Sequence, residues 1–512
     1  MFRIFDSLNW VENMKMPIET ALKTGKIVEG TICYTGDITD PNETKYTLDY
    51  YVKKAKELES LGVHIFTIKD MAGLVKPYAA KKLISALKEE LNIPVNLHTH
   101  DSTGNGVSTL LMASEAGLDI ADCAIGSMSS MTSNPCMNSL VEALKGTERD
   151  TGLNPDELTE LSQYYARIRP IYKQFESGMD APNTEIYKYE IPGGQYSNLL
   201  AQVKEMGAAE DFEEIKGLYK DANQLLGNIV KVTPSSKVVG DFAIFMFKNG
   251  LTKENILEVG KDLSYPDSVV EYFEGMIGQP EGGFPEELQK IVLKDKKPID
   301  VRPGSLLPDE DFDYIAKGLK ENFYTENMED PDILSQKTLS YALYPKVYED
   351  YCRHFEAYND VTGLESHVYF YGLRKGEETT LKLDEGKYLI IKFIDMTEPD
   401  EDGYRLLDFE VNGSIREIKV LDKNLEVKTD RRVKADKSNP AHLGSTIPGT
   451  VGKVLVNEGD EVTVNMPLMT VEAMKMETTV VSTVNGKVDK IYVKEGEQVN
   501  QEDLLISFEI DE

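Results

Sequence analysis

Two histidines two positions apart form the first pattern in this sequence that could do chemistry. His98 and His100 lie in NLHTHDSTG, after a short apolar run that is typical of a β-strand. Side chains two apart on a strand leave the same face, so both imidazoles would point to one side. Imidazole nitrogens are common metal ligands, and this pair would form half of a metal site. Packed or surface histidines are the alternative interpretation.

A lysine lies at the matching end of the preceding apolar run. Lys69, in IKDMAG, would reach the same edge of a parallel sheet as the histidines. From spacing alone, the favoured interpretation is that Lys69 forms an ion pair with Asp70. Equally, the aliphatic part of its side chain could pack on apolar surface while the ammonium group reaches water.

The segment TPSSKVVGD, residues 233–241, has the form of a helix start. Thr233 is a good N-cap residue, and Pro234 suits the first helical position. The residues alone therefore favour a capping role for Thr233.

A further lysine lies between two copies of an internal repeat. GTVGKVLVNEGDEV (449–462) matches GKVDKIYVKEGEQV (486–499) at a constant offset, which predicts a pseudo-twofold β-sandwich. Lys475 lies in the hinge between the copies, where we expect an exposed turn. A flexible amine there could carry a covalent cofactor, and the flanking methionines suit a recognition surface. A solvated surface charge is the alternative.

A repeating β–α pattern must position the first of these residues. Apolar runs that end in polar loops cover residues 2–9, 26–37, 63–73, 93–104 and 119–128, with helical stretches between them. This alternation predicts parallel strands with crossover helices. Polar clusters at the carboxyl ends favour a TIM-type (β/α) barrel over a doubly wound sheet, and no Gly-rich loop follows the first strand. A closed barrel needs eight units, so we expect a partial barrel that lacks its first three.

The remaining chain predicts an α/β plus α plus β organisation. We expect the partial barrel over residues 1–135 and a mostly helical region over 136–366. A small antiparallel β unit, beginning with HVYFYGL, would cover 367–426. A flexible linker (427–440) would then lead to the sandwich of 441–512.

Composition excludes several classes of function. The 512 residues contain 56 Lys and Arg against 88 Asp and Glu, a net charge of -32. Such a field repels nucleic acids and anionic membrane surfaces, and no apolar run is long enough to span a bilayer. The N-terminal segment does not resemble a signal peptide, and the four cysteines form no CxxC pair. We therefore expect a reduced, cytoplasmic protein.

Taken together, these motifs resemble those of the pyruvate carboxylase family. IKDMAGLVKP, NLHTHDSTGNG, GSMSSMTSNP, IPGGQYSNL and TPSSKVVGD resemble its carboxyltransferase domain, and EAMKM resembles a biotinyl domain. The resemblance implies that carbamylated Lys69 binds a divalent metal (Zn, Mn or Co) together with His98 and His100. It also implies that a biotin protein ligase attaches biotin to Lys475.

The resemblance implies an activity as well. In the family, CO2 passes from carboxybiotin to pyruvate and gives oxaloacetate, a reaction that serves anaplerosis and gluconeogenesis. The hydroxyl of Thr233 would shuttle a proton between the pyruvate methyl group and biotin, and Ser236 would lie in the biotin pocket. Related barrels occur in the oxaloacetate decarboxylase α subunit and in transcarboxylase, but the β unit of 367–424 favours pyruvate carboxylase.

Two parts of the family pattern have no counterpart here. One is the first-strand segment D-x-T-x-R-D-A-H-Q-S, which supplies an aspartate metal ligand that Asp6 does not replace by motif. The other is the ATP-binding biotin carboxylase region. We therefore expect the chain to correspond to the C-terminal part of an enzyme that is homotetrameric when complete and that needs upstream parts. The second hypothesis is a truncated biotin carrier and assembly module without catalysis of its own.

Overall fold

The protein is described by a computed structural model that forms two compact units, Met1–Leu306 with Arg432–Glu512, and Leu307–Arg431. The described residues are 1–176, 179–323, 325, 327–400, 402–422, 433–436, 439–473 and 476–510. All four cysteines are free thiols. None of the helices among the described residues has the length and apolar character needed to cross a bilayer.

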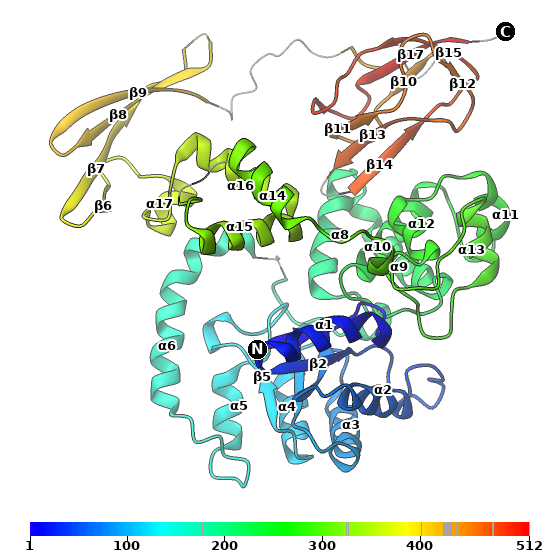
Figure 1. Ribbon diagram of the computed structural model, residues 1–512, viewed down its shortest axis with the longest axis vertical. Coiled ribbons are helices and arrows are strands. Elements are labelled where there is room, and N and C mark those ends of the chain that lie inside the picture. Colours follow the sequence, from blue (N-terminus) through cyan, green and yellow to red (C-terminus); the bar gives the residue numbers. More distant parts are fainter. Residues whose placement is uncertain are drawn as a thin grey trace. The chain divides into compact units, whose positions relative to one another are not determined.

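A five-stranded parallel sheet opens the chain, in the order β1-β2-β3-β4-β5, with helices between successive strands (Figure 1). The strands are β1 (Phe2–Ile4), β2 (Val28–Cys33), β3 (Ile65–Asp70), β4 (Val95–Thr99) and β5 (Ile120–Asp122). The connecting helices are α1 (Val11–Lys23), α2 (Leu48–Ser60), α3 (Pro77–Glu90) and α4 (Gly106–Glu115). The predicted β–α alternation is confirmed, and the domain is TIM-barrel-like.

Local sequence explains where these elements begin and end. Every residue of β2 is buried, as a central strand of a parallel sheet requires. Helix α2 begins after Thr47, whose side chain accepts a hydrogen bond from the Tyr50 amide, and it buries Tyr51, Ala55 and Leu58 along one face. The chain turns at Gly62 (φ 85°), a backbone conformation that suits glycine.

Helices follow the sheet, as the sequence predicts. They are α5 (Met137–Leu144), α6 (Pro155–Ile168), α7 (Ile186–Tyr189), α8 (Gly193–Glu205), α9 (Phe212–Leu225), α10 (Ser235–Lys248), α11 (Ile256–Val259), α12 (Asp267–Glu274) and α13 (Glu286–Leu293). Helices α9 and α10 pack together over a second apolar core that includes Tyr219, Phe242 and Tyr272. This core is separate from the one around the sheet.

The second unit contains helices and an antiparallel sheet. Its helices are α14 (Phe312–Asn322), α15 (Pro331–Leu343), α16 (Pro345–Tyr358) and α17 (Ser366–Tyr371). The prediction that HVYFYGL begins the β unit is wrong, because this segment forms α17. His367, Val368 and Phe370 are half-buried while Tyr369 and Tyr371 are exposed, which is not the strict alternation of a strand.

The antiparallel sheet itself is present. Its strands β6 (Glu378–Asp384), β7 (Lys387–Met396), β8 (Tyr404–Val411) and β9 (Ser414–Leu421) lie in sequence order. Between β8 and β9, Asn412 and Gly413 both have positive φ (49° and 80°). A two-residue loop with positive φ at both positions matches the right-handed twist of the flanking strands.

The C-terminal domain consists of two four-stranded sheets in the orders β10-β17-β15-β12 and β14-β13-β11-β16. Their strands are β10 (His442–Gly444), β11 (Gly449–Val454), β12 (Glu461–Val462), β13 (Pro467–Ala473), β14 (Met476–Val481), β15 (Gly486–Ile491), β16 (Gln498–Val499) and β17 (Leu504–Ile510). The two repeats exchange equivalent bonds, because the Val454 amide donates to Glu495 (3.0 Å) and the Ile491 amide donates to Glu458 (3.1 Å). The predicted pseudo-twofold sandwich is confirmed.

Part of the predicted linker, residues 427–440, lies against this sandwich. Lys434 forms an isolated β-bridge with Asp503, and its ammonium nitrogen lies 2.8 Å from the Asp503 carboxylate. Residues 427–432 and 437–438 of the linker lie outside the described residues.

Candidate active site

The structure brings the three predicted metal ligands together at the carboxyl edge of the parallel sheet. Lys69 of β3 and His98 of β4 are register partners, and His100 follows the end of β4. The rings of His98 and His100 lie 5.3 Å apart between centroids. The prediction that both imidazoles leave the same face is therefore confirmed.

His100 is held as a neutral imidazole with one fixed tautomer. Its Nδ1 lies 2.6 Å from the Thr132 carbonyl oxygen, which can only accept, so Nδ1 carries the hydrogen and Nε2 keeps its lone pair. Burial is the main cause that lowers the pKa of His100 to about 4; the bond to Thr132 opposes this shift, and the neighbouring His98 and Lys69 contribute to it. A metal-binding histidine needs this neutral form.

His98 is oriented by a carboxylate on the next strand. Its Nδ1 lies 2.8 Å from Asp122, which is its register partner on β5. Arg3 of β1 lies 2.7 Å from both Asp122 and the buried Glu29. Burial alone would raise the pKa of Asp122, but the hydrogen bonds and charges of His98 and Arg3 lower it to about 2. A carboxylate behind a histidine is the usual support for a metal ligand.

The alternative interpretation of Lys69 as a partner of Asp70 does not match the contacts. The Asp70 carboxylate accepts hydrogen bonds from the amides of Leu74 and Val75 and from the Thr99 hydroxyl. The Lys69 ammonium instead lies 5.3 Å from the centre of the Phe5 ring. Asp70 therefore shapes the loop after β3 and leaves the Lys69 side chain on the histidine side of the sheet.

The residues present fit a divalent metal. Two imidazoles with engaged Nδ1 atoms share a face with a lysine, and carbamylation would convert that lysine into an oxygen donor. Among the described residues, no cluster of three or more His, Cys, Asp or Glu side chains could hold a metal by itself. Asp6 supplies no ligand here, because its carboxylate accepts from the amides of Leu8 and Trp10 and from the Asn13 side chain.

Thr233 lies directly before α10, but not as its N-cap. The helix begins at Ser235 with Pro234 as N-cap, and no side chain caps it, so the predicted capping role of Thr233 is wrong. Ser235 makes the local bonds instead, since its Oγ accepts from the Val232 amide (3.1 Å) and lies 2.6 Å from the Val232 carbonyl oxygen. Thr233 is exposed, whereas Ser236 is buried in the first helical turn.

The candidate biotin-bearing residue falls between two paired strands. Strands β13 and β14 pair as far as Ala473 and Met476. Lys475 itself lies outside the described residues, so its role stays a prediction.

The sequence pattern does not single out Arg3, Glu29, Asp122, Glu190 or Lys231. Asp122 could be found by aligning the carboxyl ends of the predicted strands, because it is in register with His98. Glu190 and Lys231 are 41 residues apart in the sequence but lie in contact, a pairing that no local sequence pattern predicts.

Three family models match successive parts of the chain. A model described as HMGL-like matches residues 17–164, and the conserved carboxylase domain matches residues 186–392. The model described as biotin-requiring enzyme matches residues 440–508.

Several characterised proteins are similar to this chain. Pyruvate carboxylase of Bacillus subtilis (strain 168) is 49% identical over 509 residues, which are 99% of this chain and 44% of that protein. Pyruvate carboxylase of Staphylococcus aureus (strain Mu50 / ATCC 700699) is 46% identical, and the match covers 99% of this chain and 44% of that protein. The chain thus spans less than half the length of these curated relatives.

Solved structures give the same result. The carboxyl transferase domain from Rhizobium etli pyruvate carboxylase is 43% identical with a TM-score of 0.77, and the match covers 83% of this chain and 70% of that one. The complete Rhizobium etli enzyme is 40% identical with a TM-score of 0.77, covering 99% of this chain and 46% of that one. The chain belongs to the pyruvate carboxylase family and corresponds to the C-terminal part of those enzymes.

Proposed function

We propose that this chain carries out biotin-dependent carboxyl transfer to pyruvate, giving oxaloacetate. One observation carries the proposal: Lys69, His98 and His100 meet on one face at the carboxyl edge of the sheet. This edge is where (β/α) barrels place their active sites. The Rhizobium etli carboxyl transferase domain, 43% identical, has been solved with pyruvate and biocytin.

The metal-ligand residues have distinct tasks in this proposal. His98 and His100 would bind through Nε2, since Nδ1 of each is engaged by Asp122 and by the Thr132 carbonyl oxygen. Lys69 would add an oxygen after carbamylation. A divalent cation held there would supply Lewis-acid stabilisation of negative charge that develops on the pyruvate oxygen.

Thr233 would move the proton. Its side chain is exposed at the start of α10, where a substrate can reach it. A hydroxyl can accept a proton from the pyruvate methyl group on one side and donate one to biotin on the other. Ser236 is buried in the first turn of α10, and we assign it to the biotin site.

The sandwich domain would deliver biotin on Lys475. Strands β13 and β14 pair as far as Ala473 and Met476, and Lys475 falls between these two residues in the sequence. Covalent attachment to the same chain keeps the effective concentration of biotin high without a tight docking surface.

The complete reaction would need parts that this chain does not provide. We assign to upstream segments the first three barrel units with their aspartate metal ligand, and the ATP-dependent carboxylation of biotin. The domain boundaries proposed from sequence, a homotetrameric complete enzyme and a cytoplasmic location belong to this same proposal. The four free cysteines suit a reducing compartment.

The test is oxaloacetate formation from pyruvate by the biotinylated chain together with its upstream segment. Replacing Thr233 by Ala should lower kcat by about 100-fold or more, the usual contribution of a positioned proton carrier. The exposed Thr252, before α11, provides the matched control Thr252→Ala, which should keep full activity. Full activity of Thr233→Ala would contradict the assignment, and an inactive unsubstituted enzyme would favour the carrier-module hypothesis.

A further inference from the structure

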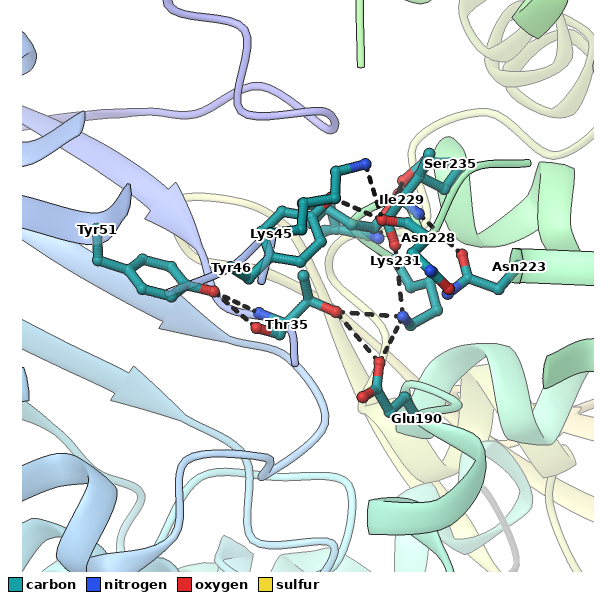
Figure 2. A network of polar contacts seen from close by, with 12 residues as sticks. Thr35, Lys45, Tyr46, Tyr51, Glu190, Asn223, Asn228, Ile229, Lys231 and Ser235 are labelled. Carbon is teal, nitrogen blue, oxygen red and sulfur yellow. Dashed lines mark hydrogen bonds and ion pairs between the residues drawn. The ribbon is translucent and has the colours of Figure 1, made fainter. Parts of the chain in front are cut away.

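A lysine that the proposed chemistry does not use lies two residues before Thr233. The side chain of Lys231 is 3% exposed, and its Nζ lies 2.6 Å from a Glu190 carboxylate oxygen. It also donates to the Thr35 hydroxyl (3.1 Å), which in turn donates to Glu190 (3.2 Å). Figure 2 shows the three side chains pointing toward one another. We call this set the Thr35–Glu190–Lys231 network.

The three residues come from distant parts of the chain. Thr35 follows β2 of the parallel sheet, Glu190 is the residue after α7, and Lys231 precedes α10. The backbone of Thr35 is itself fixed by Tyr51. The Thr35 amide donates to the Tyr51 hydroxyl (2.9 Å), and this hydroxyl donates to the Thr35 carbonyl oxygen (2.8 Å). The network thus ties the segment before α10 to a rigid part of the sheet domain.

Such a pair is a poor way to gain stability. Lys231 is buried and Glu190 is half-buried, with 27% of its side chain exposed. Removing such charges from water is costly, and well-packed apolar residues often stabilise a fold equally well. Burial opposes ionisation of Glu190, but the charge and hydrogen bond of Lys231 outweigh it and lower the pKa of this carboxyl. Glu190 also has a left-handed backbone (φ 54°), which is unfavourable for a residue other than glycine. We therefore explain the buried charge and the unfavourable backbone of Glu190 by a geometry that this part of the chain must keep for function.

Other bonds hold the same segment on both sides of Thr233. Before it, Lys45 donates to the Gly227 carbonyl oxygen (2.7 Å) and Tyr46 donates to that of Asn228 (2.8 Å). After it, Ser235 Oγ lies 3.2 Å from the carbonyl oxygen of Ser7, in the loop after β1. Loops after the carboxyl ends of β1 and β2 therefore both contact residues 227–235. Figure 2 shows Thr35, Lys45 and Tyr46 of the loop after β2 beside this segment.

The bonds that hold residues 227–235 are connected to the predicted metal ligands through the backbone. The amide of Tyr34, the neighbour of Thr35, donates to the backbone carbonyl oxygen of Lys69 (2.8 Å). The chain of bonds from Lys231 through Thr35 thus ends at the backbone of a predicted metal ligand. Thr233 lies inside the part of the chain that these bonds fix, and it is exposed there together with Asn228 and Pro234.

We propose that the Thr35–Glu190–Lys231 network is a positioning device that holds the Thr233 hydroxyl at a fixed place relative to Lys69 and the histidines. The proposal deepens the proposed function and rests on it. Lys231 and Glu190 are positioning residues, and neither touches substrate. Their loss should lower turnover more than substrate binding, because small displacements of a catalytic group cost rate steeply.

The chain offers a matched control for removing this ion pair. Lys216 is 4% exposed, and its ammonium lies 2.7 Å from both Glu185 and Glu213, away from Thr233 in sequence. Glu213 is exposed, so the control variant leaves no buried charge without a partner. The test variant is Lys231→Met with Glu190→Gln, which removes both charges and leaves neither buried alone. The control is Lys216→Met with Glu185→Gln. Lys231→Arg keeps the charge as a rescue, and Thr35→Val removes a single hydroxyl with the least risk to folding.

Two measurements on the full chain and on the completed enzyme decide the proposal. Hydrogen–deuterium exchange of a peptide covering residues 229–236 should become about 10-fold faster in the test variant. Exchange should accelerate by a smaller factor in Thr35→Val and should not change in the control variant. In the enzyme, kcat should fall about 100-fold while KM for pyruvate stays within about 2-fold, and Lys231→Arg should recover part of the loss.

Unchanged exchange in the test variant and in Thr35→Val would overturn the proposal, as would faster exchange with unchanged kcat. An equal loss of kcat in the control variant would also overturn it, because it would reduce the effect to general destabilisation. If the unsubstituted enzyme makes no oxaloacetate, the proposed function fails, and the exchange measurement alone then decides whether the network fixes this segment.

Discussion

Lys69 and His98 face each other as register partners in the parallel ladder between β3 and β4. This pairing puts a potential oxygen donor and an imidazole on the same face of the sheet, with His100 beside them. The two histidines alone do not complete a metal site, so Lys69 is the decisive third ligand of the proposed site.

The first prediction concerns metal content. Lys69→Met should reduce the metal that copurifies with the chain by at least about 10-fold, because no third donor of the described residues replaces it. Elemental analysis of the purified protein measures this. Lys88→Met is the control, since Lys88 forms an exposed ion pair with Asp119 (2.7 Å) in the same domain. Unchanged metal content in Lys69→Met would rule out this set of ligands.

The second prediction concerns the carboxylate behind His98. Asp122→Asn keeps the shape of the side chain but removes the charge that orients the imidazole 2.8 Å away. Metal affinity should fall about 10- to 100-fold, the usual effect of losing such a partner. Competition with a chelator of known affinity measures the change, and Asp119→Asn provides the control. Wild-type affinity in Asp122→Asn would show that Asp122 only neutralises Arg3.

The third prediction is a pH dependence located in α10. Burial raises the pKa of Asp241 to about 6, against the smaller opposing effects of the Ser268 hydroxyl and Lys237. Between about pH 4 and pH 6 the folded chain holds a proton there that the unfolded chain has lost. The contribution of Asp241 to stability therefore falls as pH rises through this window, by about 2–3 kcal/mol.

Asp241→Asn should remove this dependence. Thermal unfolding between pH 4 and pH 7 should show a flatter pH profile in the variant, with a midpoint at pH 7 equal to or above that of the unsubstituted chain. The exposed Asp262 gives the control Asp262→Asn, which should keep the original profile. An unchanged slope in Asp241→Asn would mean that this carboxyl is ionised throughout the range.

Sequence patterns were sufficient for the sheet, for the sandwich and for placing Lys69 at the same sheet edge as the two histidines, whereas its role as a ligand came only from the family resemblance. Period-two and helical spacing are local, and parallel strands necessarily bring their carboxyl ends to one edge. The internal repeat likewise specifies equivalent strands, because Glu458 and Glu495 occupy matching repeat positions and accept equivalent backbone hydrogen bonds.

Local patterns failed where non-local contacts decide the structure. Aromatic residues in HVYFYGL favour a strand by propensity, but the segment forms α17 and ends at Gly372 (φ 69°). The start of α10 is set by Ser235, whose hydroxyl contacts the loop after β1, and not by Thr233. The partners Arg3 and Lys231 depend on folding that brings distant segments together, so single-sequence spacing cannot reveal them.

We propose that biotin on Lys475 takes part in making oxaloacetate from pyruvate. The most direct measurement compares oxaloacetate formation by Lys475→Arg with that by Lys490→Arg, an exposed lysine of the same domain, each in the enzyme completed by its upstream segment and treated with biotin ligase. We expect Lys475→Arg to gain no biotin mass and to make no oxaloacetate, while Lys490→Arg matches the unsubstituted enzyme. Oxaloacetate formation by Lys475→Arg at the unsubstituted rate would show that biotin on Lys475 has no part in the reaction.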